Sequence, residues 1–303
     1  MVTRRPNAGF HRFGGDWTTR KLEIVAGYLQ AYTTALKKQP FEKVYIDAFA
    51  GSGYRVGRQR TLTDKQPAEM LFPELAAQEP QQLLAGSAKR ALAVEPPFGR
   101  YIFIERNQTR RGELEALKSE FPSLGDRIQI EGGDANRKLR DLCGGEWASR
   151  RAVLFLDPYG MQVEWATIEA VARTKAIDLW LLFPLGMGVN RLLPRSAEIP
   201  DSWRQRLDLV LGTTDWYDKF YTVDAVPNLF DEQDEQVRKV SMDRIGQYFL
   251  ERLGGVFSGV LERPAVLRNS TNNPLYLLCF AAGNPKGTSI ALKIARHLLK
   301  LNS

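Results

Sequence analysis

VYIDAFAGSG, at residues 44–53, carries the strongest structural signal in the sequence. Its first residues are mostly β-branched or aromatic, and they run into an acid and then into a Gly-x-Gly turn. We expect residues 44–47 to form a buried parallel strand, because such strands are apolar on both faces. Gly51 and Gly53 let the backbone turn sharply and approach a ligand without an intervening Cβ. Since ligands of open α/β sheets bind beyond the carboxyl ends of the strands, we expect this stretch to form the floor of a small-molecule site.

The turn differs from two common phosphate-binding motifs. The residues after Gly53 are YRVG, so the third glycine of the dinucleotide-binding Gly-x-Gly-x-x-Gly motif is missing, and no Gly-Lys-Ser/Thr sequence marks a P-loop. An acid followed by a small-residue Gly-x-Gly turn instead resembles the first motif of S-adenosylmethionine (SAM)-dependent methyltransferases. A tight strand-to-helix turn without any ligand is the alternative explanation.

Length and composition are those of a soluble globular protein. The 303 residues can bury one large core or two small ones, and 44% of them are hydrophobic. The net charge of +7 suits a polyanionic partner such as nucleic acid, although a solvated basic surface would explain it as well. The two cysteines and two histidines have no metal-ligand spacing, so we expect no metal site. Low cysteine use and the lack of a signal peptide or a long apolar run indicate a cytoplasmic protein.

Strand and helix patterns alternate along the chain. Strands are expected at 44–47, 101–105, 127–131, 152–156 and 178–183, and helices at 19–38, 88–95, 109–121, 137–142 and 165–174. This alternation predicts an α/β fold with a doubly wound, mostly parallel sheet, in which the most apolar strand, 152–156, is central. Further expected elements are a helix start at 231–235, a helix at 237–253, antiparallel edge strands at 256–266 and 274–281, and a closing helix at 288–301.

The pattern predicts one domain over residues 1–303, with an N-terminal helix and insertions at about 54–86 and 184–235, the second of them helical. Lys21 lies in the first turn of the expected N-terminal helix, where a cation opposes the helix dipole. Either Lys21 has a partner elsewhere in the fold, or it is an ordinary exposed lysine.

Four acids mark the ends of expected strands or the turns after them: Asp47, Glu105, Asp134 and Asp157. If the ligand is SAM, Glu105 accepts hydrogen bonds from both ribose hydroxyls, Asp134 accepts one from the adenine amine, and Asp47 lies near the methionine ammonium or the sulfonium. Helix N-capping is the alternative role of these acids. We favour the ligand for Asp47 and Glu105, and both interpretations stay open for Asp134. The remaining residues of the expected cofactor site are Phe49, Ala50, Gly51, Gly53 and Ala135.

DPYG at residues 157–160 carries the expected acceptor chemistry. It resembles the Asp-Pro-Pro-Tyr motif of amino-methyltransferases that act on adenine, with one proline in place of two and the tyrosine one position earlier. In that motif the acid and a backbone carbonyl hold the exocyclic amine, and the aromatic ring stacks on the base. The Pro-Cys motif of enzymes that methylate carbon atoms of cytosine is absent, because Cys143 and Cys279 both follow leucine.

The second insertion combines basic and aromatic side chains. Its arginines are Arg191, Arg195, Arg204 and Arg206, and its aromatic residues are Trp203, Trp216, Tyr217, Phe220 and Tyr221. Such a mixture is typical of nucleic-acid binding. A helical cap whose aromatic residues belong to the core is the alternative.

The combined pattern resembles the three-Cys-motif partner (TcmP) family. The residues that carry the resemblance are WTTRKL at 17–22, YIDAFAGSG at 45–53, Gly86-Ser87, LFLDPYG at 154–160 and LFP at 182–184. The resemblance implies a methyltransferase-like Rossmann fold and association with a separate three-cysteine protein. It also implies that Lys21 corresponds to a lysine near the acceptor pocket of related adenine methyltransferases.

These observations predict a SAM-dependent methyltransferase that acts on an exocyclic amine of a nucleobase in DNA or RNA. The expected catalytic residues are Asp157, Pro158, Tyr159 and Lys21. A non-catalytic partner subunit with the same fold, which binds SAM or a partner protein, is the alternative. A nicotinamide-dependent dehydrogenase is disfavoured by the missing third glycine.

Overall fold

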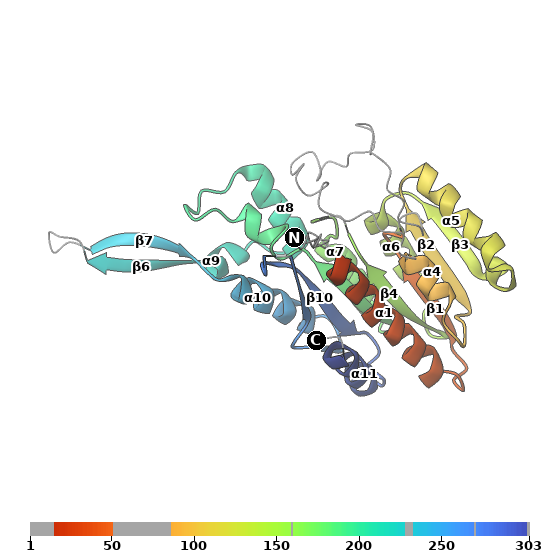
Figure 1. Cartoon of the computed structure of the whole chain (residues 1–303). Helices are drawn as coiled ribbons and strands as arrows, with labels where there is room; N and C mark the ends of the chain where they lie inside the picture. Colours follow the sequence, from red (N-terminus) through yellow and green to blue (C-terminus); the bar gives the residue numbers. More distant parts are fainter. Residues whose placement is uncertain (1–14, 51–85, 159, 228–232, 270, 302–303) are drawn as a thin grey trace, which may run out of the picture.

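The computed structural model describes residues 15–50, 86–158, 160–227, 233–269 and 271–301. Its centre is a mixed sheet in the order β3-β2-β1-β4-β5-β10-β8, with β9 also paired to β10 (Figure 1). The five parallel strands are β1 (Glu42–Asp47), β2 (Arg100–Glu105), β3 (Ile128–Gly132), β4 (Arg150–Leu156) and β5 (Ile177–Phe183). The antiparallel edge consists of β8 (Gly259–Val260), β9 (Ala265–Arg268) and β10 (Pro274–Ala282).

The parallel strands are apolar because helices cover both of their faces. One face carries α1 (Gly15–Ala35), α4 (Ser87–Leu92), α5 (Gln108–Glu120) and α11 (Thr288–Leu301), and the other carries α6 (Ala135–Cys143), α7 (Trp165–Arg173) and α10 (Met242–Gly254). Neighbouring residues of β1 show the consequence: Tyr45 packs into the first layer and Ile46 into the second, and both are fully buried. The predicted doubly wound, mostly parallel sheet is confirmed, and β4 is central in it as expected.

Within the described residues, two short 3-10 helices also lie near the sheet. They are η2 (Pro122–Arg127), which leads into β3, and η3 (Val189–Leu192), which follows β5. None of the helices in the described ranges is long and apolar enough to cross a bilayer.

The second insertion differs from its prediction. It contains the expected helices, α8 (Asp201–Leu211) and α9 (Trp216–Phe220), but also an antiparallel hairpin of β6 (Tyr221–Pro227) and β7 (Gln233–Lys239). Figure 1 shows this hairpin extending away from the sheet. The predicted helix start at 231–235 is wrong where it is described, because residues 233–235 belong to β7. The first insertion, about 54–86, lies outside the described residues apart from Gly86.

Three other boundaries also need correction. The helix predicted at 237–253 begins only at Met242, because the Ser241 side chain accepts a hydrogen bond from the Arg244 amide and caps it. The strand predicted at 256–266 is two short strands, β8 and β9. Helix α1 begins at Gly15 instead of residue 19, so Lys21 lies in its second turn and the expected conflict with the helix dipole does not arise.

Candidate active site

Three of the predicted acids lie at the carboxyl ends of three neighbouring strands. Asp47 is the last residue of β1, Glu105 is the last residue of β2, and Asp157 directly follows β4. Strand β1 lies between β2 and β4, with Asp47 level with Phe103 and Phe155. Since neighbouring strands lie about 4.8 Å apart, the three carboxyl groups share one edge of the sheet.

Asp157 is held by a buried lysine from the N-terminal helix. The Lys21 Nζ lies 2.8 Å from Asp157 Oδ1 and 2.6 Å from Oδ2, so it contacts both carboxylate oxygens. Lys21 is only 1% exposed, whereas Asp157 is 17% exposed. The apolar neighbours Leu22 and Val25 fix this part of α1 against the sheet. Of the two interpretations of Lys21, the structure therefore shows the lysine with a partner, 136 residues away in sequence.

Asp47 is completely buried beside this ion pair. Its Oδ1 accepts a hydrogen bond from the Phe49 amide and its Oδ2 accepts one from the Tyr45 hydroxyl, each at 3.3 Å, and the Ser87 side chain is a third partner. Burial, together with the nearby charge of Asp157, raises the pKa of Asp47 to about 7, although the hydrogen bonds from Ser87, Phe49 and Tyr45 act to lower it. At neutral pH this carboxyl group is therefore partly protonated, and a nearby positive charge would favour its ionised form.

Glu105 is nearly buried, and it does not cap a helix. Its Oε1 accepts a hydrogen bond from the Asn107 amide at 2.7 Å, and its Oε2 lies 3.8 Å from Arg110 Nη1. The cap of α5 is Asn107, whose side chain accepts from the Arg110 amide. Each carboxylate oxygen has two acceptor positions, so Glu105 can accept further hydrogen bonds at this edge.

Asp134 occupies the N-cap position that was one of its two interpretations. Its Oδ1 accepts a hydrogen bond from the Arg137 amide at 3.0 Å, and the residue is exposed beyond the end of β3. Ala135, the first residue of α6, is buried beside it. Capping uses one acceptor position, so the carboxylate can still accept a hydrogen bond from a ligand.

The capping interpretation is wrong for Asp157. The next helix, α7, begins at Trp165, and its N-cap is Glu164. Pro158 is buried, and Gly160 adopts a positive φ of 66° that favours glycine. At the end of β1, the Ala50 amide donates to the Ile104 carbonyl at 3.3 Å and ties that segment to β2.

Three predicted site residues, Gly51, Gly53 and Tyr159, lie outside the described residues.

The segment after Asp157 depends on a buried asparagine that the sequence analysis did not select. The Asn136 amide nitrogen donates to the Gln162 carbonyl at 2.8 Å, and its oxygen accepts from the Glu164 amide at 3.0 Å and from the Thr167 hydroxyl at 2.9 Å. Asn136 is 6% exposed, so these bonds satisfy a buried amide and fix residues 162–167 relative to α6. A polar residue in the first turn after the Asp134 cap was the available signal.

The aromatic residues of the second insertion belong largely to the core. Trp216, Phe220 and Tyr221 are buried. The Arg204 guanidinium lies 4.7 Å from the centre of the Tyr217 ring, so it packs within the insertion. The helical-cap interpretation therefore describes these aromatic residues better than a base-stacking surface does.

Comparisons with known proteins give likenesses in structure alone. No protein-family model and no curated protein matches the chain. Protein LPL1258 from Legionella pneumophila str. Philadelphia 1 is 14% identical, with 80% of this chain and 93% of that chain covered and a TM-score of 0.40. A candidate sarcosine dimethylglycine methyltransferase from Galdieria sulphuraria is 10% identical, with coverage of 92% and 80% and a TM-score of 0.33. The candidate methyltransferase yhhF from Escherichia coli is 10% identical, with coverage of 70% and 84% and a TM-score of 0.29. At these identities and TM-scores the likenesses establish no residue role and no activity for this chain.

Proposed function

We propose that this chain is a SAM-dependent methyltransferase that transfers a methyl group to an exocyclic amine of a nucleobase in DNA or RNA. The observation that carries the proposal is the Asp157 carboxylate, which lies at the centre of the sheet's carboxyl edge, bonded to a buried lysine and beside the buried Asp47. Ligands of such sheets bind at this edge.

The carboxyl groups described at this edge offer hydrogen-bond acceptors and negative charge that suit the polar groups of SAM. Glu105 offers a nearly buried carboxylate with free acceptor positions, which suits the two ribose hydroxyls. Asp47, with a pKa of about 7, ionises more readily when a positive ammonium or sulfonium group lies close to it. Asp134 and Ala135, just after the end of β3, contact the adenine of SAM in this proposal. When bound, SAM supplies an electrophilic methyl group.

Asp157 holds the acceptor amine in this proposal. Lys21 contacts both oxygens of Asp157 and so fixes the orientation of the carboxylate. The free acceptor positions of Asp157 take a hydrogen bond from the amine N–H, and this aligns the nitrogen lone pair toward the methyl group. Alignment of this kind can contribute about 7–11 kcal/mol to lowering a barrier. Pro158 and Tyr159 complete the acceptor site as the resemblance to adenine amino-methyltransferases implies.

The nucleic-acid acceptor is supported by charge. The chain has a net charge of +7, and Arg191, Arg195 and Arg206 of the second insertion are exposed. If these side chains contact phosphates, binding to DNA or RNA weakens steeply as the salt concentration rises, because counterions are released on binding.

A non-catalytic partner subunit is the second candidate. The observation that favours it is the same ion pair, because Lys21 already bonds both oxygens of Asp157 and neutralises its charge. The resemblance to the three-Cys-motif partner family points in the same direction, with a three-cysteine protein as the partner.

Mass spectrometry of DNA and of RNA incubated with the protein and methyl-labelled SAM tests the proposal. We expect the label on an exocyclic base amine in one of the two nucleic acids. If the protein binds SAM in calorimetry but transfers the label to no nucleic acid or protein, the partner-subunit function is favoured. If NAD binds and SAM does not, the cofactor assignment is wrong.

A further inference from the structure

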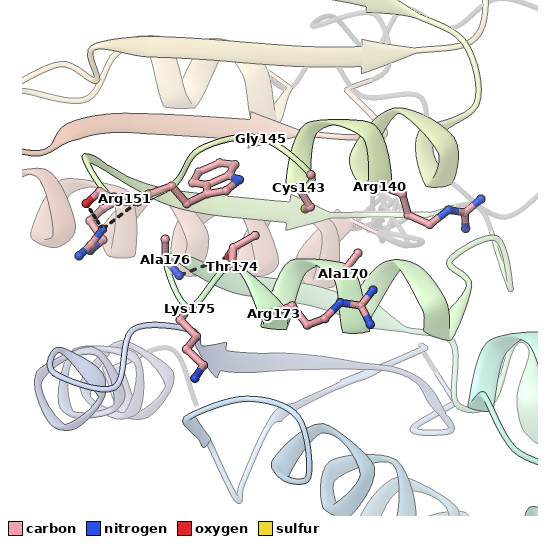
Figure 2. A pocket seen from close by; sticks show the side chains of 12 residues that line it. Arg140, Cys143, Gly145, Arg151, Ala170, Arg173, Thr174, Lys175 and Ala176 are labelled. Atoms are coloured by element: carbon pink, nitrogen blue, oxygen red, sulfur yellow. Dashed lines mark hydrogen bonds between the residues drawn. The ribbon is translucent and has the colours of Figure 1, made fainter.

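A second charged region lies at the amino end of the same strands. A cavity of about 510 Å³ opens between α6 and α7, above the starts of β4 and β5 (Figure 2). Arg151, in β4, lines it and precedes Asp157 by six residues. At about 3.3 Å per residue along a strand, the cavity is roughly 20 Å from the proposed active site.

The charged residues that line this cavity in the described part of the chain are all basic: Arg140, Arg151, Arg173 and Lys175. Arg140 pairs with Glu164 at 2.6 Å. Helices α6 and α7 both end here, and the carboxyl end of a helix carries about half a negative charge. Glu164 and the two helix ends thus offset about two of the four positive charges, and the cavity keeps a positive potential.

Arg173 and Lys175 are the most available of these cations. Both are exposed, and neither forms an ion pair within the described ranges. Arg151, by contrast, uses its Nη1 to donate to the carbonyls of Trp147, Ala148 and Arg150, so it holds the loop in front of β4. An anion can therefore bind Arg173 and Lys175 without breaking a contact that the fold needs.

Lys175 also has an unusual backbone conformation. Its φ of 51° lies in the left-handed region, in the short turn between α7 and β5. This region costs a residue with a Cβ roughly 1–2 kcal/mol, and glycine or asparagine is the common choice after a helix. The turn is fixed by the Thr174 hydroxyl, which donates to the Val171 carbonyl at 2.7 Å. The left-handed conformation ends α7 and places Lys175 on the rim of the cavity.

Part of the cavity wall is apolar. Trp147 is 7% exposed, and Ala148, Ala170 and Ala176 lie beside it. Cys143 also lines the wall, and burial raises the pKa of its thiol to about 12, so this group is neutral and contributes no anion or nucleophile. The cavity volume falls within the range of small-molecule sites, about 300–1,000 Å³.

We infer that this cavity binds a phosphorylated ligand of nucleotide size, with Arg173 on the phosphate oxygens, Lys175 adding positive charge at the rim, and the apolar part of the wall against the organic part. The phosphate chemistry is shared by two sources, a free nucleotide and a nucleotide unit of a nucleic acid. The inference does not depend on methyl transfer, because the cavity and the acids Asp47, Glu105 and Asp157 lie at opposite ends of the strands.

The test compares two double variants that each remove two exposed positive charges. Arg173→Ala/Lys175→Asn changes the cavity, and asparagine tolerates the left-handed backbone at position 175. Lys293→Ala/Arg296→Ala changes exposed residues of α11, on the other face of the sheet, and is the matched control. Thermal unfolding without ligand checks that both variants fold as the parent does.

Cytidine diphosphate is the probe, because it lacks the adenine that the carboxyl edge is proposed to recognise. In calorimetry we expect the parent to bind it, the cavity variant to bind at least tenfold more weakly, and the control variant to bind within twofold of the parent. Saturating SAM should leave this binding unchanged, because the two ligands occupy opposite ends of the strands, so failure of this inference and failure of the proposed function are distinguishable. A parent that does not bind the probe, or equal weakening in both double variants, would overturn the inference.

A single-stranded RNA of ten nucleotides identifies the source of the phosphate. If the ligand is a nucleic-acid segment, the cavity variant also binds this RNA more weakly than the control variant does, and cytidine diphosphate competes with the RNA. If the ligand is a free nucleotide, both double variants bind the RNA equally. Either result, together with the calorimetric difference, supports the phosphate site.

Discussion

The charged side chains at the two ends of the central strands differ in burial and in pairing. At the carboxyl edge the charged groups are buried and bonded: Lys21 is 1% exposed, Asp47 is fully buried, and Glu105 is 6% exposed. At the amino edge Arg173 and Lys175 are exposed and form no ion pair within the described residues. A buried charge pair has a fixed geometry, which suits alignment of a reacting group, whereas exposed cations attract an anion without fixing it. The two proposals, chemistry at the carboxyl edge and capture of a ligand at the amino edge, rest on this difference.

The largest expected effect comes from breaking the buried ion pair. Lys21→Met leaves the Asp157 carboxylate without its partner, and removal of one member of a buried pair costs about 3–5 kcal/mol of unfolding free energy. Arg173→Ala, at the amino edge, is the matched cation removal and should cost less than about 0.5 kcal/mol, because no partner is left unpaired. Urea unfolding of both variants measures the contrast.

A double-mutant cycle then measures the interaction free energy between Lys21 and Asp157. Lys21→Met/Asp157→Asn should recover part of the lost stability, since neither charge is then left alone. Additive costs of the two single changes would show that Lys21 and Asp157 do not stabilise each other.

Glu105→Ala should produce the next largest effect. Hydrogen bonds to a charged group contribute about 1.5–3 kcal/mol, so loss of the ribose contacts should weaken SAM binding by roughly 10- to 100-fold. The control is Glu42→Ala, at the amino end of β1, where the carboxylate pairs with Arg100 and Arg150. Calorimetry should show unchanged SAM binding for Glu42→Ala. Equal losses of SAM affinity in Glu105→Ala and Glu42→Ala would contradict the placement of SAM at the carboxyl edge.

Another expected effect is a pH dependence from Asp47. The folded-state pKa is about 7, well above the ordinary value of 3.8, so between these pH values the folded protein binds more protons than the unfolded chain. The free energy of unfolding contributed by this group therefore falls as the pH rises from about 4 to about 7, by at most about 1.4 kcal/mol per pH unit.

In Asp47→Asn this part of the pH dependence should disappear. A remainder from Asp178 should persist, because burial raises the pKa of that carboxyl group to about 6 against the hydrogen bond donated by Tyr28. Urea unfolding at pH 5 and pH 7.5 measures the change, and an unaltered slope would contradict the assignment of this proton to Asp47.

The central sheet was predictable from sequence because its signals are local. Residues 44–47 and 152–156 are apolar runs bounded by turns, and parallel strands covered on both faces require such runs. The positions of Asp47, Glu105 and Asp157 followed from the same strands, since the carboxyl ends of parallel strands meet at one edge.

The contacts within both charged regions could not be predicted from the sequence, because the regions bring together residues that lie far apart in it. The Lys21–Asp157 pair joins residues 136 positions apart, and only the packing of α1 on the sheet brings them together. The four basic residues of the cavity come from two helices, a strand and a turn, and form no sequence motif. Strand β7 was missed because glutamine and glutamate favour helices, and its pairing with β6 outweighs that preference.

Asp157→Asn tests the central claim most directly, because it keeps the shape of the side chain and replaces one acceptor oxygen with a donor. The variant is compared with the parent in two measurements, the affinity for SAM and the rate of methyl transfer to the acceptor that the labelling experiment identifies. Glu164→Gln, on the segment that follows Asp157, is the control for a general loss of a carboxylate. We expect Asp157→Asn to bind SAM nearly as well as the parent and to transfer methyl groups about 100- to 1,000-fold more slowly, since one transition-state hydrogen bond is worth about 2.7–4 kcal/mol. A transfer rate equal to that of the parent would contradict the claim that Asp157 holds the acceptor amine.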